Sequence, residues 1–222
     1  MALLINIDTS TSIGSVCLSN QGIPLKTLFC DHQQKHAAHL QNLIGILMEE
    51  FKVDPDQVGG IAIAGGPGSY TGLRVATATA KGLCYAWGIP LLSINSLEMM
   101  ASGMIQLLKG SPGLYCPMID ARRQEVYTAI YQSDLTTVLD PCQMILKSDS
   151  FLTFENETRF YFFGDGSQKW RKVNPLLGGA EFPDFSPSAS FLVPIAEKAF
   201  QLRQFQDLAY FEPFYLQSFF QT

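Results

Sequence analysis

The sequence has few charged residues and no run of basic ones. Charged side chains make up 16% of the 222 residues, and the formal net charge at pH 7 is −5. An acidic chain without a Lys/Arg cluster is a poor nucleic-acid binder on its own. The composition therefore argues against an independent DNA- or RNA-binding protein. The hydrophobic fraction of 47% instead leaves apolar surface for a protein partner.

Cysteine motifs, a secretion signal and membrane spans are also missing. The five cysteines are scattered and include no C-x-x-C pair, so neither a zinc ribbon nor a disulfide framework is indicated. The first residues lack a basic segment and soon reach Asp8, so no secretory leader is predicted. No apolar run has transmembrane length. These absences predict a cytoplasmic protein that binds no membrane.

Histidine is scarce as well, with three residues confined to positions 32–39. His32 and His36 are four residues apart, a spacing that can hold a metal from one face of a helix. Because a helix is expected to begin near His36, polar residues at a helix start are the preferred interpretation. A nucleophilic serine or cysteine would need a histidine base, and none lies outside this segment. The sequence thus gives little support to a metallopeptidase.

A glycine-rich turn is the most informative segment that is present. An apolar run over residues 61–64 leads into Gly65-Gly66-Pro67-Gly68, and a helix with small residues follows. Glycine permits positive φ and close backbone approach at such a junction. The first turn of a helix also has N–H groups that can bind an anion, so a phosphate site and a ligand-free connection both stay open. A P-loop is excluded because the G-x-x-x-x-G-K-[ST] order is absent.

The apolar spacing predicts an α/β chain with a boundary at residues 109–113, where Lys-Gly-Ser-Pro-Gly occurs. Before the boundary, strands are expected over 3–8, 14–19, 23–30, 60–64 and 90–94, and helices over 36–51, 70–87 and 96–108. After it, we expect strands over 114–120, 125–132 and 159–163, a loop over 176–188, and a helix over 189–204. Three antiparallel strands followed by helix–strand–helix–strand are typical of ribonuclease-H-like and actin/hexokinase ATPase half-domains.

Four segments together resemble the TsaB (YeaZ) family, whose members are bacterial partner proteins in making threonylcarbamoyladenosine in tRNA. They are residues 5–11, 65–74, 119–127 and 212–216. The resemblance spans nearly the whole chain, and it is weak from about residue 136 to 206. It implies an α/β fold of two ribonuclease-H-like lobes of the actin/hexokinase ATPase (ASKHA) superfamily. The first lobe would be residues 1–108, and residues 109–222 would form a smaller second lobe.

The resemblance implies a subunit without catalytic residues of its own. It would support a TsaD-like transferase that modifies adenosine 37 of tRNAs reading codons that begin with A. A TsaE-like ATPase would complete the complex, and tRNA would be contacted mainly through that complex. Without its partner the chain is expected to form a homodimer through the same surface.

The expected partner surface lies on the helices over residues 36–51 and 70–87, which form a four-helix bundle with a matching pair in the family. Both helices are apolar on more than one side, as expected of helices between their own sheet and another protein. The expected interface residues are His39, Leu43, Ile46, Leu47, Gly68, Tyr70, Thr71, Arg74, Val75, Ala78 and Lys81.

A small ATPase or kinase of the actin/hexokinase type is the alternative function. Two turns are candidate phosphate sites: Asp8, Thr9, Ser10 and Thr11 after the first strand, and Gly164, Asp165 and Gly166 in the second half. Neither turn contains lysine or arginine. We therefore expect no tightly bound cofactor, and ATP or ADP only weakly or at an interface shared with a partner.

Two further positions bear on metals and partners. By comparison with TsaD, Ser96 and Met100 stand where two histidines would hold its metal, and neither suits a hard metal, so no metal is expected. The charged segment from Asp120 to Glu125 fits a solvated hairpin with surface ion pairs. The alternative is that Arg122 or Arg123 contacts a partner or a tRNA phosphate.

Overall fold

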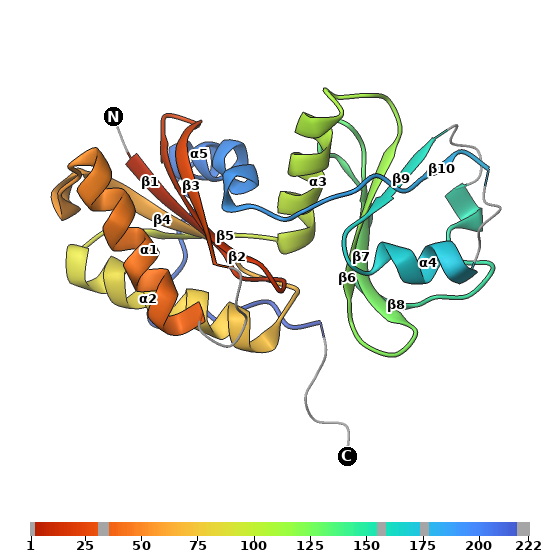
Figure 1. Ribbon diagram of the computed structural model, residues 1–222, viewed down its shortest axis with the longest axis horizontal. Coiled ribbons are helices and arrows are strands. Elements are labelled where there is room, and N and C mark those ends of the chain that lie inside the picture. The colour runs from red at the N-terminus through yellow and green to blue at the C-terminus, as the bar shows by residue number, and fades with distance from the viewer. Residues whose placement is uncertain (1–2, 31–35, 155–158, 174–177, 217–222) are drawn as a thin grey trace, which may run out of the picture.

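The structure is a computed structural model that describes residues 3–30, 36–154, 159–173 and 178–216, with the backbone alone for residues 36–38. Two five-stranded sheets lie on either side of a layer of two helices (Figure 1). In Figure 1, α1 and α2 lie below the first sheet, α5 lies above it, α3 stands between the two sheets, and α4 lies to the right of the second sheet. We call the first sheet with its covering helices the first lobe, and the second sheet with α4 the second lobe.

The first sheet has the strand order β3-β2-β1-β4-β5. Its first three strands are antiparallel, and β4 and β5 run parallel to β1. Ile5 and Ile7 alternate with Leu4, so the isoleucines point to α1 and α2 and the leucine points to the central layer. The elements are β1 (Leu3–Asp8), β2 (Gly14–Asn20), β3 (Ile23–Cys30), α1 (His36–Phe51), the 3-10 turn η2 (Pro55–Gln57), β4 (Val58–Ala64), α2 (Tyr70–Trp87) and β5 (Leu91–Ile94).

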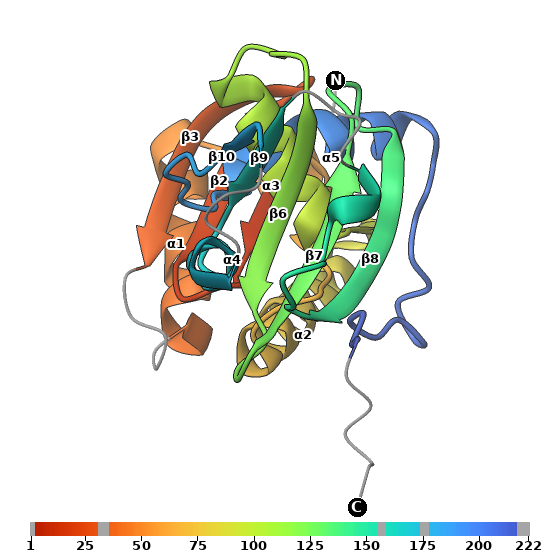
Figure 2. The ribbon, with the colours of Figure 1, turned by 90° about the vertical axis from the view of Figure 1, so that its right-hand side faces the viewer.

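The second sheet repeats the first in the order β8-β7-β6-β9-β10 (Figure 2). Again the first three strands are antiparallel and the last two run parallel to the first. Within the described residues, the short η3 stands where the first lobe has α1, and α4 replaces α2. The elements are β6 (Leu114–Asp120), β7 (Glu125–Tyr131), β8 (Thr137–Ile145), η3 (Leu152–Phe154), β9 (Phe160–Phe163), α4 (Ser167–Val173) and β10 (Ala180–Glu181). The prediction of two actin/hexokinase-type lobes, the second reduced, is confirmed.

Each half of the chain supplies one helix to the other half's sheet. α3 (Ser96–Leu107) packs on β6 and β7, whereas η4 (Ala189–Leu192) and α5 (Val193–Gln201) pack on the first sheet. Met100, Met104, Leu192 and Ala196 share one core cluster with residues of both sheets. The end of the chain therefore lies against the first sheet, although it follows the second lobe in sequence.

Four elements differ from the sequence-based prediction. The helix expected over 189–204 is the 3-10 turn η4 followed by α5, which ends at Gln201. β8 has no clean alternation of buried and exposed residues, because it is an edge strand and contains Pro141. α4 has 7 residues, too few for a helical apolar period to show. β10 has 2 residues inside the stretch expected to be a loop.

Candidate functional site

A cleft of about 430 Å³ opens between the two lobes. One wall is the turn after β1 together with the start of α2, and the other is the end of β6 with its turn into β7. Residues 214–216, near the end of the described chain, form part of the rim. The first wall carries hydroxyl groups from Ser10, Thr11, Ser12, Ser69 and Thr71.

The predicted phosphate turn after β1 is only partly available to this cleft. Asp8 is 0% exposed, and its Oδ1 accepts hydrogen bonds from Ser10 N at 2.9 Å and Ser10 Oγ at 2.6 Å. Burial raises the pKa of the Asp8 carboxyl above its ordinary value of 3.8, against the lowering effect of the two bonds from Ser10. Thr9 Oγ1 donates to the Gly72 carbonyl oxygen at 2.7 Å. Ser10 and Thr11 line the cleft, whereas Asp8 and Thr9 face the interior of the first lobe.

Two glycines at the start of α2 serve close packing against this turn. A Cβ on Gly68 would lie 2.3 Å from the Ser10 carbonyl oxygen, and one on Gly72 would lie 2.0 Å from that of Thr9. Ser69 N donates to the Ser10 carbonyl oxygen at 2.7 Å, and Ser69 Oγ caps the helix by accepting from Gly72 N at 3.3 Å. At these positions the glycine pattern is explained by a tight connection.

In the second candidate phosphate turn, glycines again allow close packing of the backbone. Gly164 has φ of +92°, and a Cβ there would lie 2.4 Å from the Met118 carbonyl oxygen. Gly166 N donates to that same oxygen at 3.1 Å. Asp165 lines the cleft, and its Oδ1 accepts from Asp120 N at 2.9 Å. The turn therefore presents a carboxylate to the cleft, where a phosphate site would present a cation.

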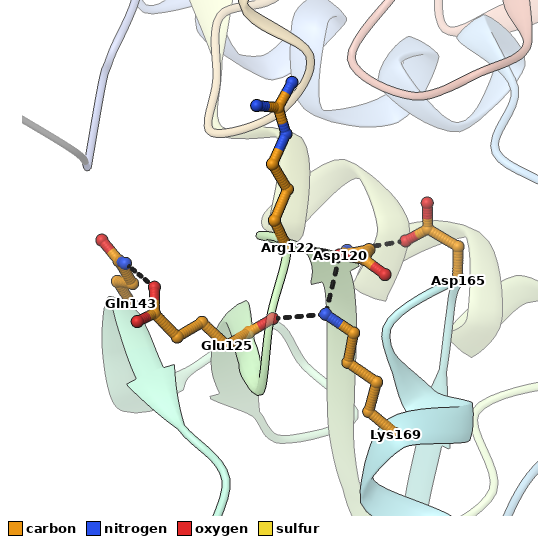
Figure 3. Close-up of polar contacts among 6 residues, drawn as sticks. All are labelled: Asp120, Arg122, Glu125, Gln143, Asp165 and Lys169. Atoms are coloured by element: carbon orange, nitrogen blue, oxygen red, sulfur yellow. Dashed lines mark hydrogen bonds and ion pairs between the residues drawn. The ribbon is translucent and has the colours of Figure 1, made fainter. Parts of the chain in front are cut away.

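A charged cluster fixes the turn from β6 to β7 (Figure 3). Lys169 of α4 forms a 2.7 Å salt bridge with Asp120 and donates to the Glu125 carbonyl oxygen at 3.0 Å. Asp120 Oδ1 also accepts from Arg122 N at 2.6 Å, and Gln143 donates to the Glu125 carboxylate. The Arg122 side chain extends away from these groups (Figure 3). Among the described residues that line the cleft, Arg122 alone is basic.

A second candidate site is the outer surface of α1 and α2. On α2, Thr71, Arg74, Ala78, Gly82 and Tyr85 are exposed and follow one another at helical spacing. On α1, Gly45 is exposed as well. A Cβ at Gly45 or Gly82 would meet no atom of the described residues within 4 Å. We call this α2 stripe and the exposed side of α1 around Gly45 the partner face.

The two exposed glycines of the partner face are not required by packing within the part of the chain that the structure describes. Glycine in a helix interior costs about 1 kcal/mol relative to alanine, and both positions have room for a side chain. Small residues on exposed helix surfaces let a second backbone approach closely. These two positions therefore leave room for the backbone of another helix.

The structure places the predicted interface residues on several sides of the two helices. His39, Ile46, Tyr70, Thr71, Arg74 and Ala78 are exposed, and Leu43, Gly68, Val75 and Lys81 are half-buried. Leu47 is 1% exposed and packs in the core beneath α1, so it is not part of the surface. Glu50 reaches Lys26 of β3 at 2.7 Å, so the flank of α1 that carries Ile46 and Glu50 faces β3 rather than α2.

The positions considered for metal binding have other contacts. Ser96 Oγ accepts from Gly66 N at 3.1 Å, and Met100 is 0% exposed in the central core. His32 and the side chain of His36 lie outside the described residues. In the part of the chain that the structure describes, no three His, Cys, Asp or Glu side chains are grouped as metal ligands. None of the helices described there has the length and apolarity to cross a bilayer.

Comparison with known proteins adds to this geometry. The family model described as "TsaD: tRNA N6-adenosine threonylcarbamoyltransferase" matches residues 31–211. The chain is 28% identical over 183 residues to the tRNA threonylcarbamoyladenosine biosynthesis protein TsaB of Bacillus subtilis, covering 81% of this chain and 78% of that protein. It is 27% identical over 225 residues to the protein of the same name from Escherichia coli, covering 97% and 94%.

A solved structure has the same architecture over the full length. It is described as an uncharacterized protein with similarity to peptidase YEAZ from Pseudomonas aeruginosa, and it matches with a TM-score of 0.87 at 25% identity. The match covers 98% of this chain and 100% of that one. Sequence relatives, family model and architecture agree, and the chain belongs to the TsaB (YeaZ) family.

Proposed function

We propose that this chain is a non-catalytic partner subunit in the formation of threonylcarbamoyladenosine in tRNA. Its TsaB relatives are named for this biosynthesis, and the matching family model is that of the transferase TsaD. The observation that carries the proposal is the partner face, where Gly45 and Gly82 leave space that none of the described residues fills.

The partner face is suited to a pair of helices from a TsaD-like subunit. Ala78 and Gly82 provide a shallow strip along α2, and Arg74 at one end lies 4.4 Å from the centre of the Tyr70 ring. A matching helix pair would complete a four-helix bundle across this strip. The same strip can pair with its copy about a two-fold axis, so homodimer and complex would compete.

The cleft supports a non-catalytic role. Phosphoryl transfer needs cations on the phosphates and a carboxylate that reaches metal-bound water. Here Asp8 is buried and bonded to Ser10, and Asp165 offers negative charge where phosphate would lie. We expect the isolated chain to bind ATP or ADP weakly, with tighter binding only at an interface shared with a partner.

The remaining partners follow from this role. Catalysis would lie in the TsaD-like subunit, and a TsaE-like ATPase would join the complex. Because the net charge is −5, tRNA contact is expected mainly through the assembled complex. The setting would be the cytoplasm, which fits five cysteines without a disulfide.

Reconstitution of the modification tests this function. TsaD, TsaE and the enzyme that makes the threonylcarbamoyl donor, all from the same organism, are mixed with tRNA, and the modified nucleoside is quantified by mass spectrometry. Product should require this chain and should be lost with Ala78→Glu, while Gln132→Glu on the second lobe should act as wild type. Product formed without this chain, or in full with a folded Ala78→Glu variant, would overturn the proposal.

A further inference from the structure

Residues 206–216 form a strap that runs back along α2 after α5 ends. At its start, Gln206 N donates to the Leu91 carbonyl oxygen of β5 at 2.8 Å. At its end, residues 214–216 line the cleft. The strap is the blue segment between α5 and the C-terminus in Figure 1. It connects the edge of the first sheet to the cleft between the lobes.

The middle of the strap is held through its backbone. Lys81 Nζ donates to the carbonyl oxygens of Ala209 at 3.3 Å and Phe211 at 3.1 Å. Asp207 Oδ1 accepts from the N–H groups of Ala209 at 2.8 Å and Tyr210 at 3.3 Å, which fixes a tight turn. Leu208 and Phe211 pack against the core beneath α2. The Lys81 ammonium is thus engaged by backbone oxygens of the strap.

The far end of the strap is held by the glycine turn. Phe214 N donates to the Gly65 carbonyl oxygen at 2.8 Å. A Cβ on Gly66, whose φ is +114°, would lie 2.3 Å from the Phe214 carbonyl oxygen. The rings of Tyr70 and Tyr215 lie 5.3 Å apart. A Cβ on Gly65 would instead meet Ser93 Oγ of β5 at 1.9 Å, so Gly65 contacts the strap through its carbonyl oxygen alone. Gly68 and Gly72 face the turn after β1, whereas Gly66 faces the strap.

We propose that Gly65, Gly66, Tyr70 and Lys81 form a peptide-binding site whose occupant is the chain's own strap. The site recognises an extended backbone followed by an aromatic side chain, through main-chain hydrogen bonds and one ring contact. When occupied, it closes part of the rim of the cleft and supports one flank of α2. The occupied site also holds α2 in place for the TsaD-like partner, because the strap borders the partner face. This second role rests on the proposed function.

Hydrogen exchange on the full-length chain tests the site. The backbone amides of Phe211 and Phe214, which donate to Asp207 and Gly65, should exchange at least about tenfold faster in Gly66→Ala and in Lys81→Met than in wild type, because each variant removes one anchor of the strap. Chymotrypsin should then cut faster at Tyr210 and Phe214. Gly82→Ala, on the same helix, should leave both rates unchanged.

Two results would overturn the site. One is strap exchange in the wild type as fast as in an unfolded peptide, and the other is unchanged exchange in both variants. If Gly66→Ala does not fold, Lys81→Met carries the test, because it replaces only a half-buried side chain.

Capture of TsaD separates this inference from the proposed function. Ala78→Glu should abolish capture and leave strap exchange as in wild type. Asp207→Ala, which removes the turn of the strap and lies off the partner face, should speed strap exchange and weaken capture. If Ala78→Glu captures TsaD normally while Lys81→Met loosens the strap, the proposed function fails and the site stands. If Asp207→Ala frees the strap without weakening capture, the link between strap and partner face fails.

Discussion

The hydroxyl of Thr9 donates a 2.7 Å hydrogen bond to the carbonyl oxygen of Gly72, which ties the first turn of the chain to the first turn of α2. The carbonyl oxygen of Thr9 in turn lies 2.0 Å from the position that a Cβ on residue 72 would occupy. This reciprocal contact sets where α2 begins. It therefore also sets the position of the partner face.

Replacing Gly72 with alanine should destabilise the chain. The new methyl group would overlap backbone that cannot move without opening the turn after β1, and overpacking of this kind costs about 1–3 kcal/mol. Thermal unfolding followed by circular dichroism measures the effect, with Gly82→Ala as the matched control on the same helix. Equal melting temperatures for the two variants would show that the close contact is absent.

Gly82→Ala should have opposite effects on stability and association. Helix propensity should stabilise the isolated chain by up to about 1 kcal/mol, because the new methyl group would meet no atom within 4 Å among residues 3–30, 39–154, 159–173 and 178–216. Association with itself or with TsaD should weaken, because the methyl group keeps the facing helix away. Thermal unfolding at low concentration and analytical ultracentrifugation measure the two effects separately. Unchanged association would remove Gly82 from the contact.

The buried carboxyl of Asp8 should make stability depend on pH. Burial raises its folded-state pKa above 3.8. The stability that the protonated carboxyl contributes is therefore fully present below pH 3.8 and is lost as the pH rises through the folded-state pKa. Asp8→Asn cannot ionise and has no such loss. As the pH rises from 3.8 toward neutrality, the free energy of unfolding of Asp8→Asn should therefore increase relative to that of wild type. Urea unfolding at several pH values checks this, and a constant difference would contradict it.

Isothermal titration with ATP and magnesium should give weak binding or none. Both candidate phosphate turns lack a basic side chain, and the Asp8 carboxylate is already bound by the backbone N–H and the hydroxyl of Ser10. A micromolar dissociation constant that Asp8→Ala abolishes would favour the alternative of a small ATPase or kinase.

Much of the fold was predictable because its signals are local. The strands around Asp8 and the helices beginning at His36 and Tyr70 have strong apolar periods, and the structure places all of them within a few residues of the prediction. The edge strand β8 and the short α4 have no such period. The return of α5 to the first sheet is a long-range contact, and residue patterns near α5 do not encode which sheet it will meet.

In the candidate sites, too, local features could be predicted from the sequence and long-range contacts could not. The glycine turn was recognisable, but its contacts with Ser10 on one side and Phe214 on the other join distant segments. The prediction of Leu47 as a surface residue is wrong, because α1 is apolar on more than one side and sequence alone does not decide which side meets the sheet. The strap has no local pattern of its own. Residues 212–216 resemble the corresponding segment of the family, but that resemblance does not indicate that they contact the glycine turn.

The most direct test of the central claim is the affinity of this chain for TsaD from the same organism. Isothermal titration compares wild type, Ala78→Glu and the control Gln132→Glu, with circular dichroism confirming that each is folded. Burying an unpaired carboxylate at Ala78 costs several kcal/mol, so Ala78→Glu should bind at least about 100-fold more weakly. Gln132→Glu should bind as wild type does. A folded Ala78→Glu variant with wild-type affinity would contradict the assignment of α1 and α2 as the partner face.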